Sequence, residues 1–418
     1  MRAPQWEPLT YGKHLESTGD YATADDHLQH WTGTHWAQQT SDDAVRDALR
    51  WMDSNSSAIA SDAAAASAVR TAMHWLPKLR SSDDEELLIP LKNGYLRYRG
   101  GAFHLDPHDR SLGIRYLINC EFDPGAAPPA LFMAFVERIL PDVQVRERVQ
   151  EYLGYTLLPG TRAQRAALWV GDGANGKGTL ARIAQALHQR VASVRLDDLA
   201  GFGLESLVDA SLIYCDEAPK TGAGEEIMKT LVAGELAPIR RKFKSTLSTA
   251  LKAKWLICAN AVPRIKDKSD GFWRRMDIVP FDVQIPDSEK DPVLHSKILR
   301  SELAGVLLWF LEGLARFLNR GIFDPVKPPA MLKLDRLAKT SSNPLKDWVD
   351  EKEITLGKAG ATSKAMVYAT YREWADANGY KRENAGEFWE SLQKVLGPVS
   401  ETREFHGRKR LRMCNVVL

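Results

Sequence analysis

The chain has 418 residues, of which 44% are hydrophobic and 26% are charged, a composition typical of globular proteins. This length allows two or three domains of roughly 150 residues each. The formal net charge is only +2, so total charge does not indicate nucleic-acid binding, and any basic surface must be local.

The four cysteines lie far apart and form no C-x-x-C pair, which argues against a disulfide framework or a zinc site. No apolar run approaches the roughly 20 residues that a membrane helix needs. The first residues also lack the apolar core of a signal peptide. We therefore expect a cytoplasmic protein with no membrane partner.

Residues 1–87 are predicted to be a mostly helical region, because the stretch "SSAIASDAAAASAVRTAMHWL" has high helix propensity. The acidic "SSDDEE" at 81–86 is typical of a solvated connector. Residues 88–165 form a small α+β unit in this interpretation. Its first part alternates apolar and polar residues around "NG" and "GG", which predicts hairpins, and two amphipathic helices follow.

From residue 166 the pattern becomes strand, turn and helix. The apolar run "AALWV" leads into "GDGANGKGTL", and "TLARIAQALHQ" has helical spacing behind it. The runs "SLIYC" and "KWLICA" are two further candidates for buried strands. This alternation predicts an α/β core with a parallel sheet over 166–325. Prolines at 324–331 mark a link to a last domain at 340–418.

The glycine-rich loop resembles the phosphate-binding pattern G-x-x-x-x-G-K-[ST]. Its backbone N–H groups can surround phosphate oxygens, the following helix adds its positive end, and Lys177 can bridge the β- and γ-phosphates. A generic glycine-rich turn is the alternative, but the order of strand, loop and helix favours a nucleotide site. The predicted nucleotide contacts are Gly171, Gly173, Asn175, Gly176, Lys177, Gly178 and Thr179.

Magnesium coordination is the unusual part of this motif, because position 178 is glycine and supplies no hydroxyl. Thr179 lies about 100° further round the helix, so it is not a simple replacement. Asp216 and Glu217 follow the apolar run "LIYC". We expect Asp216 to hold Mg²⁺ directly or through water, and Glu217 to polarise the attacking water. An ordinary acidic strand end is the alternative.

Two further segments carry candidate catalytic residues. Asn260 follows "KWLICA" and could orient the attacking water, although a turn-forming asparagine would look the same. Arg274 and Arg275 lie in "GFWRRMDIVPF". An arginine inserted into a neighbouring subunit's site stabilises the charge of phosphoryl transfer, whereas a salt-bridged surface arginine is the alternative.

Taken together, "GDGANGKGT", "LIYCDE", "LICAN" and "FWRRMDIVPF" resemble the superfamily 3 helicases. The similarity is strongest to the phage and plasmid primase–helicase family, which includes the poxvirus primase-helicases. It covers residues 88–320 well and extends plausibly to the C-terminal region. Members carry serine or glycine after the lysine, so Gly178 fits the family.

The resemblance implies an AAA+ fold and hexameric rings that bind ATP and Mg²⁺ between subunits and move along single-stranded DNA. Lys177, Asp216, Glu217 and Asn260 match the family's motifs. For the arginine finger we favour Arg275, and Arg274 is the second candidate.

Two basic segments are candidate DNA contacts. The resemblance places a hairpin just before the Asn260 strand, pointing into the ring channel, and its basic run extends to Lys254. In the last domain, two helices and a hairpin predict a winged helix. A solvated loop and a protein-docking domain are the alternatives. The candidate DNA-binding residues are Arg240, Arg241, Lys242, Phe243, Lys244, Arg408, Lys409 and Arg410.

The sequence thus predicts an α/β protein with an AAA+ P-loop core, a helical N-terminal region and a C-terminal winged-helix-like domain. We expect an ATP-dependent DNA helicase of a phage, plasmid or mobile element in a bacterial host, working on single-stranded and forked DNA. The N-terminal region lacks a convincing carboxylate cluster for priming, so we expect priming to come from a separate primase or polymerase or from a removed segment. An AAA+ origin-binding or helicase-loading ATPase without strand displacement is the alternative.

Overall fold

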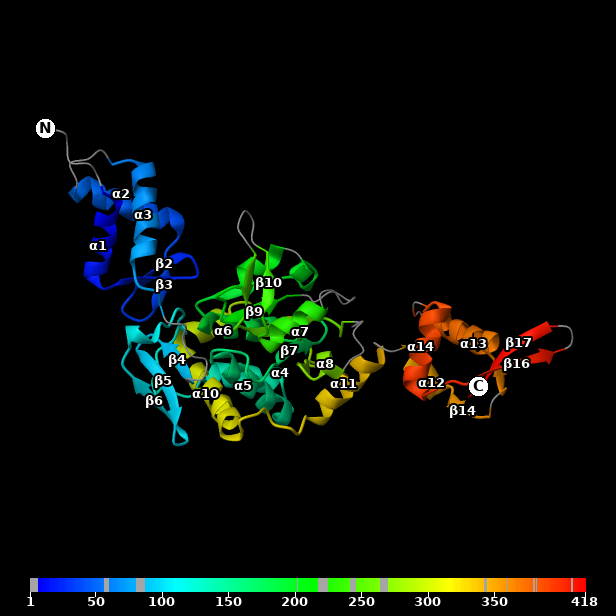
Figure 1. Ribbon diagram of the computed structural model, residues 1–418. Helices are drawn as coiled ribbons and strands as arrows, with labels where there is room; N and C mark the ends of the chain where they lie inside the picture. The colour runs from blue at the N-terminus through cyan, green and yellow to red at the C-terminus, as the bar shows by residue number, and fades with distance from the viewer. Residues whose placement is uncertain are drawn as a thin grey trace.

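The computed structural model describes residues 7–55, 60–79, 87–200, 202–216, 225–240, 246–263, 270–341, 344–358, 360–378, 380, 382–406 and 409–418. Figure 1 shows an N-terminal unit, a central unit built on a parallel sheet, and a C-terminal unit beyond α11. Each unit has its own cluster of buried apolar side chains.

The N-terminal unit contains three helices, as the alanine-rich sequence predicts, and a short antiparallel sheet that the sequence analysis did not predict. Its helices are α1 (Pro8–Thr18), α2 (Ser41–Asn55) and α3 (Asp62–Trp75). Its strands are β1 (Tyr21–Ala24), β2 (His27–Trp31) and β3 (Trp36–Gln38). Ser61 begins α3 because its side chain accepts a hydrogen bond from the Ala64 amide. Small buried alanines let α3 pack closely on α1 and α2.

A second antiparallel sheet follows, and it confirms the hairpins predicted from "NG" and "GG". Its strands are β4 (Leu88–Leu91), β5 (Gly94–Arg99) and β6 (Ala102–Asp106). Gly100 and Gly101 both have positive φ, as a tight two-residue hairpin turn requires. The two predicted amphipathic helices are α4 (Ala130–Ile139) and α5 (Val143–Thr156).

The central sheet has five strands, all parallel, and confirms the predicted α/β core. In chain order they are β7 (Ala166–Val170), β8 (Val191–Ser193), β9 (Leu212–Cys215), β12 (Lys254–Ala259) and β13 (Met276–Pro280). Across the sheet the order is β13-β7-β12-β9-β8. The fourth strand in the chain therefore lies between the first and the third.

Connections between these strands supply short helices and one hairpin. The helices are α6 (Lys177–Leu187), α7 (Glu225–Ala233) and α8 (Asp270–Trp273). The hairpin strands β10 (Ala237–Ile239) and β11 (Leu247–Thr249) pair antiparallel just before β12. This pairing confirms the prediction that a hairpin precedes β12, the strand that Asn260 follows.

Both faces of the sheet are buried, which explains the continuous apolar runs of its strands. Ala167 and Trp169 of β7 belong to one apolar cluster, and Leu168 belongs to the cluster on the other face. Three helices follow the sheet in the chain: α9 (Leu294–Ser301), α10 (Leu303–Arg320) and α11 (Pro329–Ser341).

Helices α5 and α10 cross closely because each has a glycine at the contact. A Cβ atom on Gly154 would lie 2.2 Å from the carbonyl oxygen of Phe310, and one on Gly313 would lie 2.3 Å from that of Gln150. A larger residue at either position would push the helices apart. This contact fixes α10 against the layer that covers the sheet.

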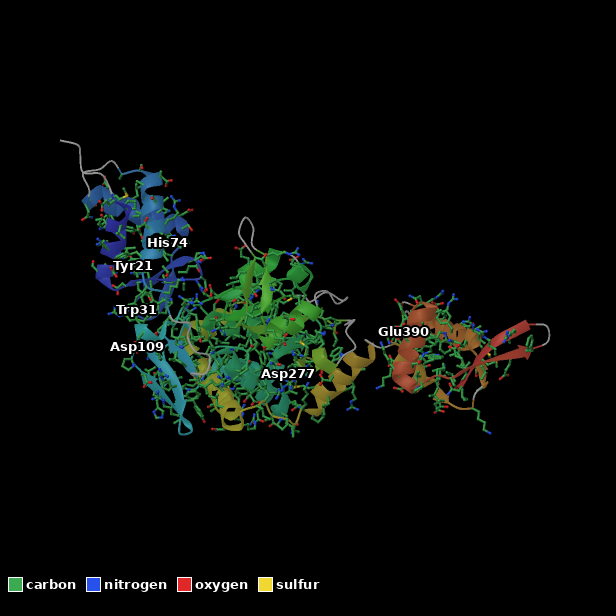
Figure 2. All side chains as sticks on the ribbon, viewed as in Figure 1. Tyr21, Trp31, His74, Asp109, Asp277 and Glu390 are labelled. Carbon is green, nitrogen blue, oxygen red and sulfur yellow. The ribbon has the colours of Figure 1, made fainter. Side chains whose placement is uncertain are left out.

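A buried charge cluster joins β13 to the helices around it, near Asp277 (Figure 2). Asp277 accepts two hydrogen bonds from the Arg148 guanidinium of α5, at 3.0 and 2.7 Å. Arg165 lies 3.5 Å and Lys327 3.6 Å from the other carboxylate oxygen. Lys327 also pairs with Asp335 of α11 at 2.7 Å. The cluster thus ties α5 and α11 to the edge strand of the sheet.

The C-terminal unit confirms the predicted order of two helices followed by a hairpin. Its helices are α12 (Pro344–Glu351), α13 (Lys364–Ala377) and α14 (Ala385–Leu396). Its strands are β14 (Thr355–Leu356), β15 (Thr362–Ser363), β16 (Glu401–His406), β17 (Lys409–Cys414) and β18 (Val416–Val417). Trp348, Tyr371 and Phe388 pack together as its aromatic core. The hairpin β16–β17 extends away from the helices (Figure 1).

Within the described residues, no helix combines the length and the apolar character that crossing a membrane requires.

Candidate functional site

The candidate site lies where three neighbouring strands of the central sheet end. Gly171 follows β7, Asn260 follows β12 and Asp216 follows β9. Because the strands are parallel and β12 lies between the other two, their carboxyl ends meet at one edge. The amide of Gly171 donates to the Ala259 carbonyl at 3.2 Å, which joins the loop to β12. Ligands of open α/β sheets bind at such an edge.

The backbone of the loop from 171 to 176 packs closely against neighbouring parts of the protein. Gly176 caps α6 with φ 81°, and a Cβ atom there would lie 2.6 Å from Ile139. A Cβ on Gly171 would meet the Phe281 carbonyl oxygen at 2.2 Å. Buried Asn175 holds the loop from within, because its side-chain amide donates to the Phe281 and Asp172 carbonyls. The glycines at 171 and 176 are therefore required by geometry.

Lys177 begins α6 and turns its ammonium back over the loop. Its Nζ donates to the Gly171 carbonyl at 2.8 Å and to Oδ1 of Asn260 at 3.3 Å. The structure thus joins two residues that the sequence separates by 83 positions. A cation at the amino end of a helix, above a ring of backbone amides, suits a phosphate group.

A cavity of about 330 Å³ opens at this point. Asp216, Asn260 and Gly178 are exposed and Thr179 is half-buried, and all four line the cavity. Its lining is Ala174, Asn175, Gly176, Lys177, Gly178, Thr179, Arg182, Asp216, Cys258, Ala259 and Asn260. Gly173 lies outside this lining. No group of three or more potential metal-ligating side chains occurs among the described residues.

Arg182 is a lining residue that the sequence analysis missed. It is exposed on α6, three positions after Thr179, so both side chains lie on the same helix face and both line the cavity. The i, i+3 spacing from Thr179 would have identified it. Arg182 brings a second fixed positive charge to a cavity that already contains Lys177.

Two groups beside Asp216, the buried Cys258 and the half-buried Tyr214, stay protonated. Burial raises the pKa of the Cys258 thiol to about 12, so this lining residue is not a nucleophile near neutral pH. Burial also raises the pKa of Tyr214, and the adjacent Cys258 and Asp216 add to that effect. A protonated Tyr214 hydroxyl beside the Asp216 carboxylate can keep that carboxylate in place.

On the expectation from the sequence that this loop binds ATP and magnesium, replacing Gly178 with serine should preserve ATP turnover and lower the magnesium concentration needed for half-maximal rate by a few-fold. A Cβ atom at 178 meets nothing within 4 Å and its backbone has no positive φ, so the serine fits. The new hydroxyl would add a magnesium ligand. A magnesium titration of ATPase activity measures the effect. Gly176→Ser, which meets Ile139 and a positive φ, is the matched control and should lose activity.

The two adjacent arginines differ sharply in exposure. Arg275 is only 9% exposed, donates to the Gly271 carbonyl at 2.6 Å and lies 3.9 Å from Glu235. Arg274 is exposed. A side chain that reaches into another subunit must be accessible, so this geometry favours Arg274 over Arg275, the residue preferred from sequence.

Several predicted residues lie outside the described residues. They are Glu217, Arg241, Lys242, Phe243, Lys244 and Arg408, together with the side chain of Lys409. Arg240, directly after β10, and Arg410 of β17 are both exposed. Lys254 is only 1% exposed and contacts the Leu158 carbonyl and the Tyr155 ring, so it belongs to the core and not to the basic surface.

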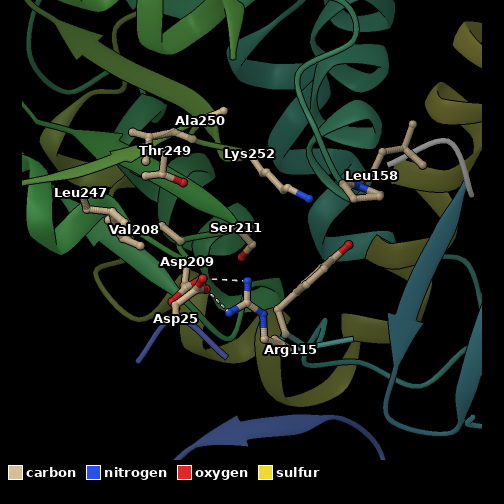
Figure 3. A pocket seen from close by; sticks show the side chains of 14 residues that line it. Asp25, Arg115, Leu158, Val208, Asp209, Ser211, Leu247, Thr249, Ala250 and Lys252 are labelled. Atoms are coloured by element: carbon tan, nitrogen blue, oxygen red, sulfur yellow. Dashed lines mark hydrogen bonds and ion pairs between the residues drawn. The ribbon is translucent and has the colours of Figure 1, made fainter. Parts of the chain in front are cut away.

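A second cavity, of about 220 Å³, lies beside β11, near the amino ends of β9 and β12 (Figure 3). There Arg115 pairs with Asp25 of the β1–β2 turn and with Asp209, which precedes β9. Asp209 also lies 3.5 Å from Arg190. These ion pairs join the N-terminal unit to the central sheet, so this cavity is a junction between units.

Two family models match parts of the chain. Residues 169–275, which contain the loop and the three strand ends, match a family of unknown function, DUF5906. Residues 11–141 match the model described as "D5 N terminal like".

Three curated relatives of low identity are viral proteins. "Putative helicase L207/L206" of Acanthamoeba polyphaga mimivirus is 26% identical over 220 residues, covering 49% of this chain and 22% of that protein. "Putative helicase 121R" of Invertebrate iridescent virus 3 is 27% identical over 229 residues, covering 50% and 24%. "Putative helicase 022R" of Frog virus 3 (isolate Goorha) is 20% identical over 367 residues, covering 77% and 37%. The chain spans about a quarter to a third of the length of these relatives.

Solved structures of the NrS-1 C-terminal region share the fold. One apo form matches with a TM-score of 0.55 at 13% identity, covering 99% of this chain and all of that one. Another has a TM-score of 0.54 at 12% identity over the same share of both chains. The sequence matches are thus partial: one family model covers the N-terminal third of the chain, and the two viral proteins with 26–27% identity align with about half of it.

Proposed function

We propose that this protein is an ATP-dependent DNA helicase of the superfamily 3 AAA+ type, a homohexamer that moves along single-stranded DNA. The observation that carries the proposal is the meeting of Lys177, Asn260 and Asp216 around one glycine-rich loop at the edge of a parallel sheet. The viral relatives named as helicases support the same activity.

In this proposal, the loop and Lys177 bind the ATP phosphates. Residues 174–179, which include the amino end of α6, line the cavity, and the glycines at 171 and 176 let the loop pack on Phe281 and Ile139 in the conformation that forms it. The Lys177 ammonium moves from the Gly171 carbonyl to the β- and γ-phosphates. Asn260, its second partner, is then free to orient the attacking water.

Magnesium fits this cavity, because Asp216 offers a carboxylate oxygen at its rim and water can complete the coordination. When bound, the ion neutralises charge on the β- and γ-phosphates. Asp216 would hold it, and Thr179 would contact a phosphate. Arg182 supplies positive charge on the side where Gly178 leaves out a hydroxyl. Glu217, predicted from sequence, takes the proton of the attacking water.

DNA contacts in this proposal come from two places. The hairpin formed by β10 and β11 carries Arg240 and the predicted residues 241–244 into the ring channel, where they contact phosphates. The C-terminal unit acts as a winged helix beside the ring. A separate primase or polymerase, in the cytoplasm of a bacterial host, completes the replication machinery.

The experiment that tests the proposal is a pair of assays on purified full-length protein. We expect ATP hydrolysis that single-stranded DNA stimulates, and ATP-dependent strand displacement on a forked substrate. Stimulated hydrolysis without displacement would instead support an origin-binding or helicase-loading AAA+ ATPase. Absence of both activities in the presence of magnesium would contradict the proposal.

Arg274→Ala is expected to lower ATP turnover by about a thousandfold while nucleotide binding persists, because a finger acts on the neighbour's γ-phosphate. Mixing Arg274→Ala with Lys177→Ala protein should restore part of the activity, since mixed rings contain intact interfaces. Arg275→Ala, the matched control, should mainly lower thermal stability, because that side chain is buried. A silent Arg274→Ala beside an inactive but stable Arg275→Ala would return the role to Arg275.

A further inference from the structure

The C-terminal hairpin presents one face that combines arginines with an exposed aromatic ring. In the register of β16 and β17, Arg403 lies opposite Arg412, and Phe405 lies opposite Arg410. Side chains alternate along a strand and directly opposed residues share a face, so these four lie together. All four are exposed, Phe405 by 73%, and the Arg410 guanidinium lies 5.8 Å from the Phe405 ring centroid.

Fold stability does not explain this composition. At the base of the same face Cys414 belongs to the core, but the hairpin then extends beyond the helices. In the described part of the chain, no ion pair within 4 Å involves Arg403, Arg410 or Arg412. Glu401, the acid at the base of the face, pairs with Lys364. The three guanidinium groups therefore remain available to an anionic partner.

The opposite face of the hairpin differs in character. Thr402, Glu404 and Leu411 alternate with the arginines, and Lys409 belongs to this second face by its register. Between the tip and the base of the hairpin, Arg403, Arg410 and Arg412 therefore share one side. The sequence predicted Arg408, Lys409 and Arg410, and the strand register adds Arg403, Phe405 and Arg412 on the face that contains Arg410.

We infer that this face binds unpaired nucleic acid, with the arginines on phosphates and a base stacked on Phe405. Exposed rings among arginines are the usual platform for single strands, because every base has a π-face that can stack. A duplex offers phosphates but keeps its bases stacked on one another, so Phe405 would add little to duplex binding. The inference rests on the proposed function in one respect, that the partner is nucleic acid, and it adds a single-strand contact outside the channel.

The test is binding of full-length protein, without nucleotide, to a fluorescent oligo-dT and to a hairpin duplex of equal charge. Phe405→Ala should weaken oligo-dT binding about tenfold and leave duplex binding unchanged, while Phe405→Trp retains both. The double variant Arg403→Ala/Arg412→Ala should weaken binding to both and flatten the salt dependence by roughly 0.7 per lost phosphate contact. Arg372→Ala on α13, an exposed arginine of the same unit, is the control for lost charge.

Ultraviolet crosslinking of a bromodeoxyuridine oligonucleotide locates the contact directly, even if the channel hairpin dominates affinity. We expect a crosslink at Phe405. No crosslink there, together with unchanged oligo-dT binding by Phe405→Ala, would overturn the inference, as would an equal loss for the duplex. Because these measurements need no ATP, inactive ATPase with a positive crosslink would contradict the proposed function and leave this inference standing.

Discussion

Replacing Lys177 with alanine is expected to lower ATP turnover by at least about a hundredfold without unfolding the protein. The ammonium lies between the Gly171 carbonyl and Asn260, at the point where all three strand ends meet. It is half-buried and its contacts are polar, so its loss leaves no buried charge unpaired. The measurement is ATPase rate beside a thermal unfolding curve.

Lys290→Ala is a suitable control for that substitution, because Lys290 is exposed and pairs only with the neighbouring Asp287. It should leave turnover unchanged. Lys177→Ala protein that hydrolyses ATP at close to the wild-type rate would remove the central residue of the proposed site. A fall in both activity and stability would show a structural role instead.

Asp277→Ala is expected to destabilise the fold by about 3 to 5 kcal/mol, the largest stability effect we predict for a single side chain. The Asp277 carboxylate is 1% exposed, and Arg148, its closest partner, is 3% exposed. Removing the carboxylate takes away the closest counter-charge of the buried Arg148 guanidinium and leaves only the more distant Glu151, at 4.0 Å, among its described ion pairs. Urea unfolding, followed by circular dichroism, measures the change.

An exposed ion pair provides the comparison. Asp287→Ala removes the pair with Lys290 at the surface and should leave the free energy of unfolding close to that of the wild type. The double variant Arg148→Met/Asp277→Leu should recover much of the loss, because apolar residues of similar volume need no counter-charge. A loss for Asp277→Ala no larger than that for Asp287→Ala would contradict the assigned role of the buried cluster.

Sequence reasoning predicted the elements that have a strong local pattern. The parallel strands are short apolar runs that end at polar residues, and the hairpins have their "NG" and "GG" turns. The order of the strands is not visible in such patterns. That β12 lies between β7 and β9 follows from packing, and it alone brings Asn260 to Lys177.

The errors have a common physical cause, because a charged residue in a sequence does not reveal whether its side chain is buried. Lys254 was grouped with a basic run but is in the core, where the Leu158 carbonyl and the Tyr155 ring receive its ammonium. The choice of Arg275 over Arg274 as the finger stays a prediction, but exposure could not be foreseen here either, because Arg275 is the buried one. The short strands β1 to β3 were also missed, since a run of only a few residues has too little periodicity to predict a strand.

The order of the central strands also determines when this domain can fold during its synthesis. β7 pairs only with β12 and β13, both of which follow it late in the chain. Ribosomes add about 5–20 residues per second, so β7, complete at Val170, waits roughly 5 to 20 seconds until β13 ends at Pro280. All five residues of β7 are buried in the finished sheet, so an aggregation-prone apolar segment is exposed throughout that interval. Chaperones that bind nascent chains should therefore engage this region, and truncation before β12 should yield insoluble protein.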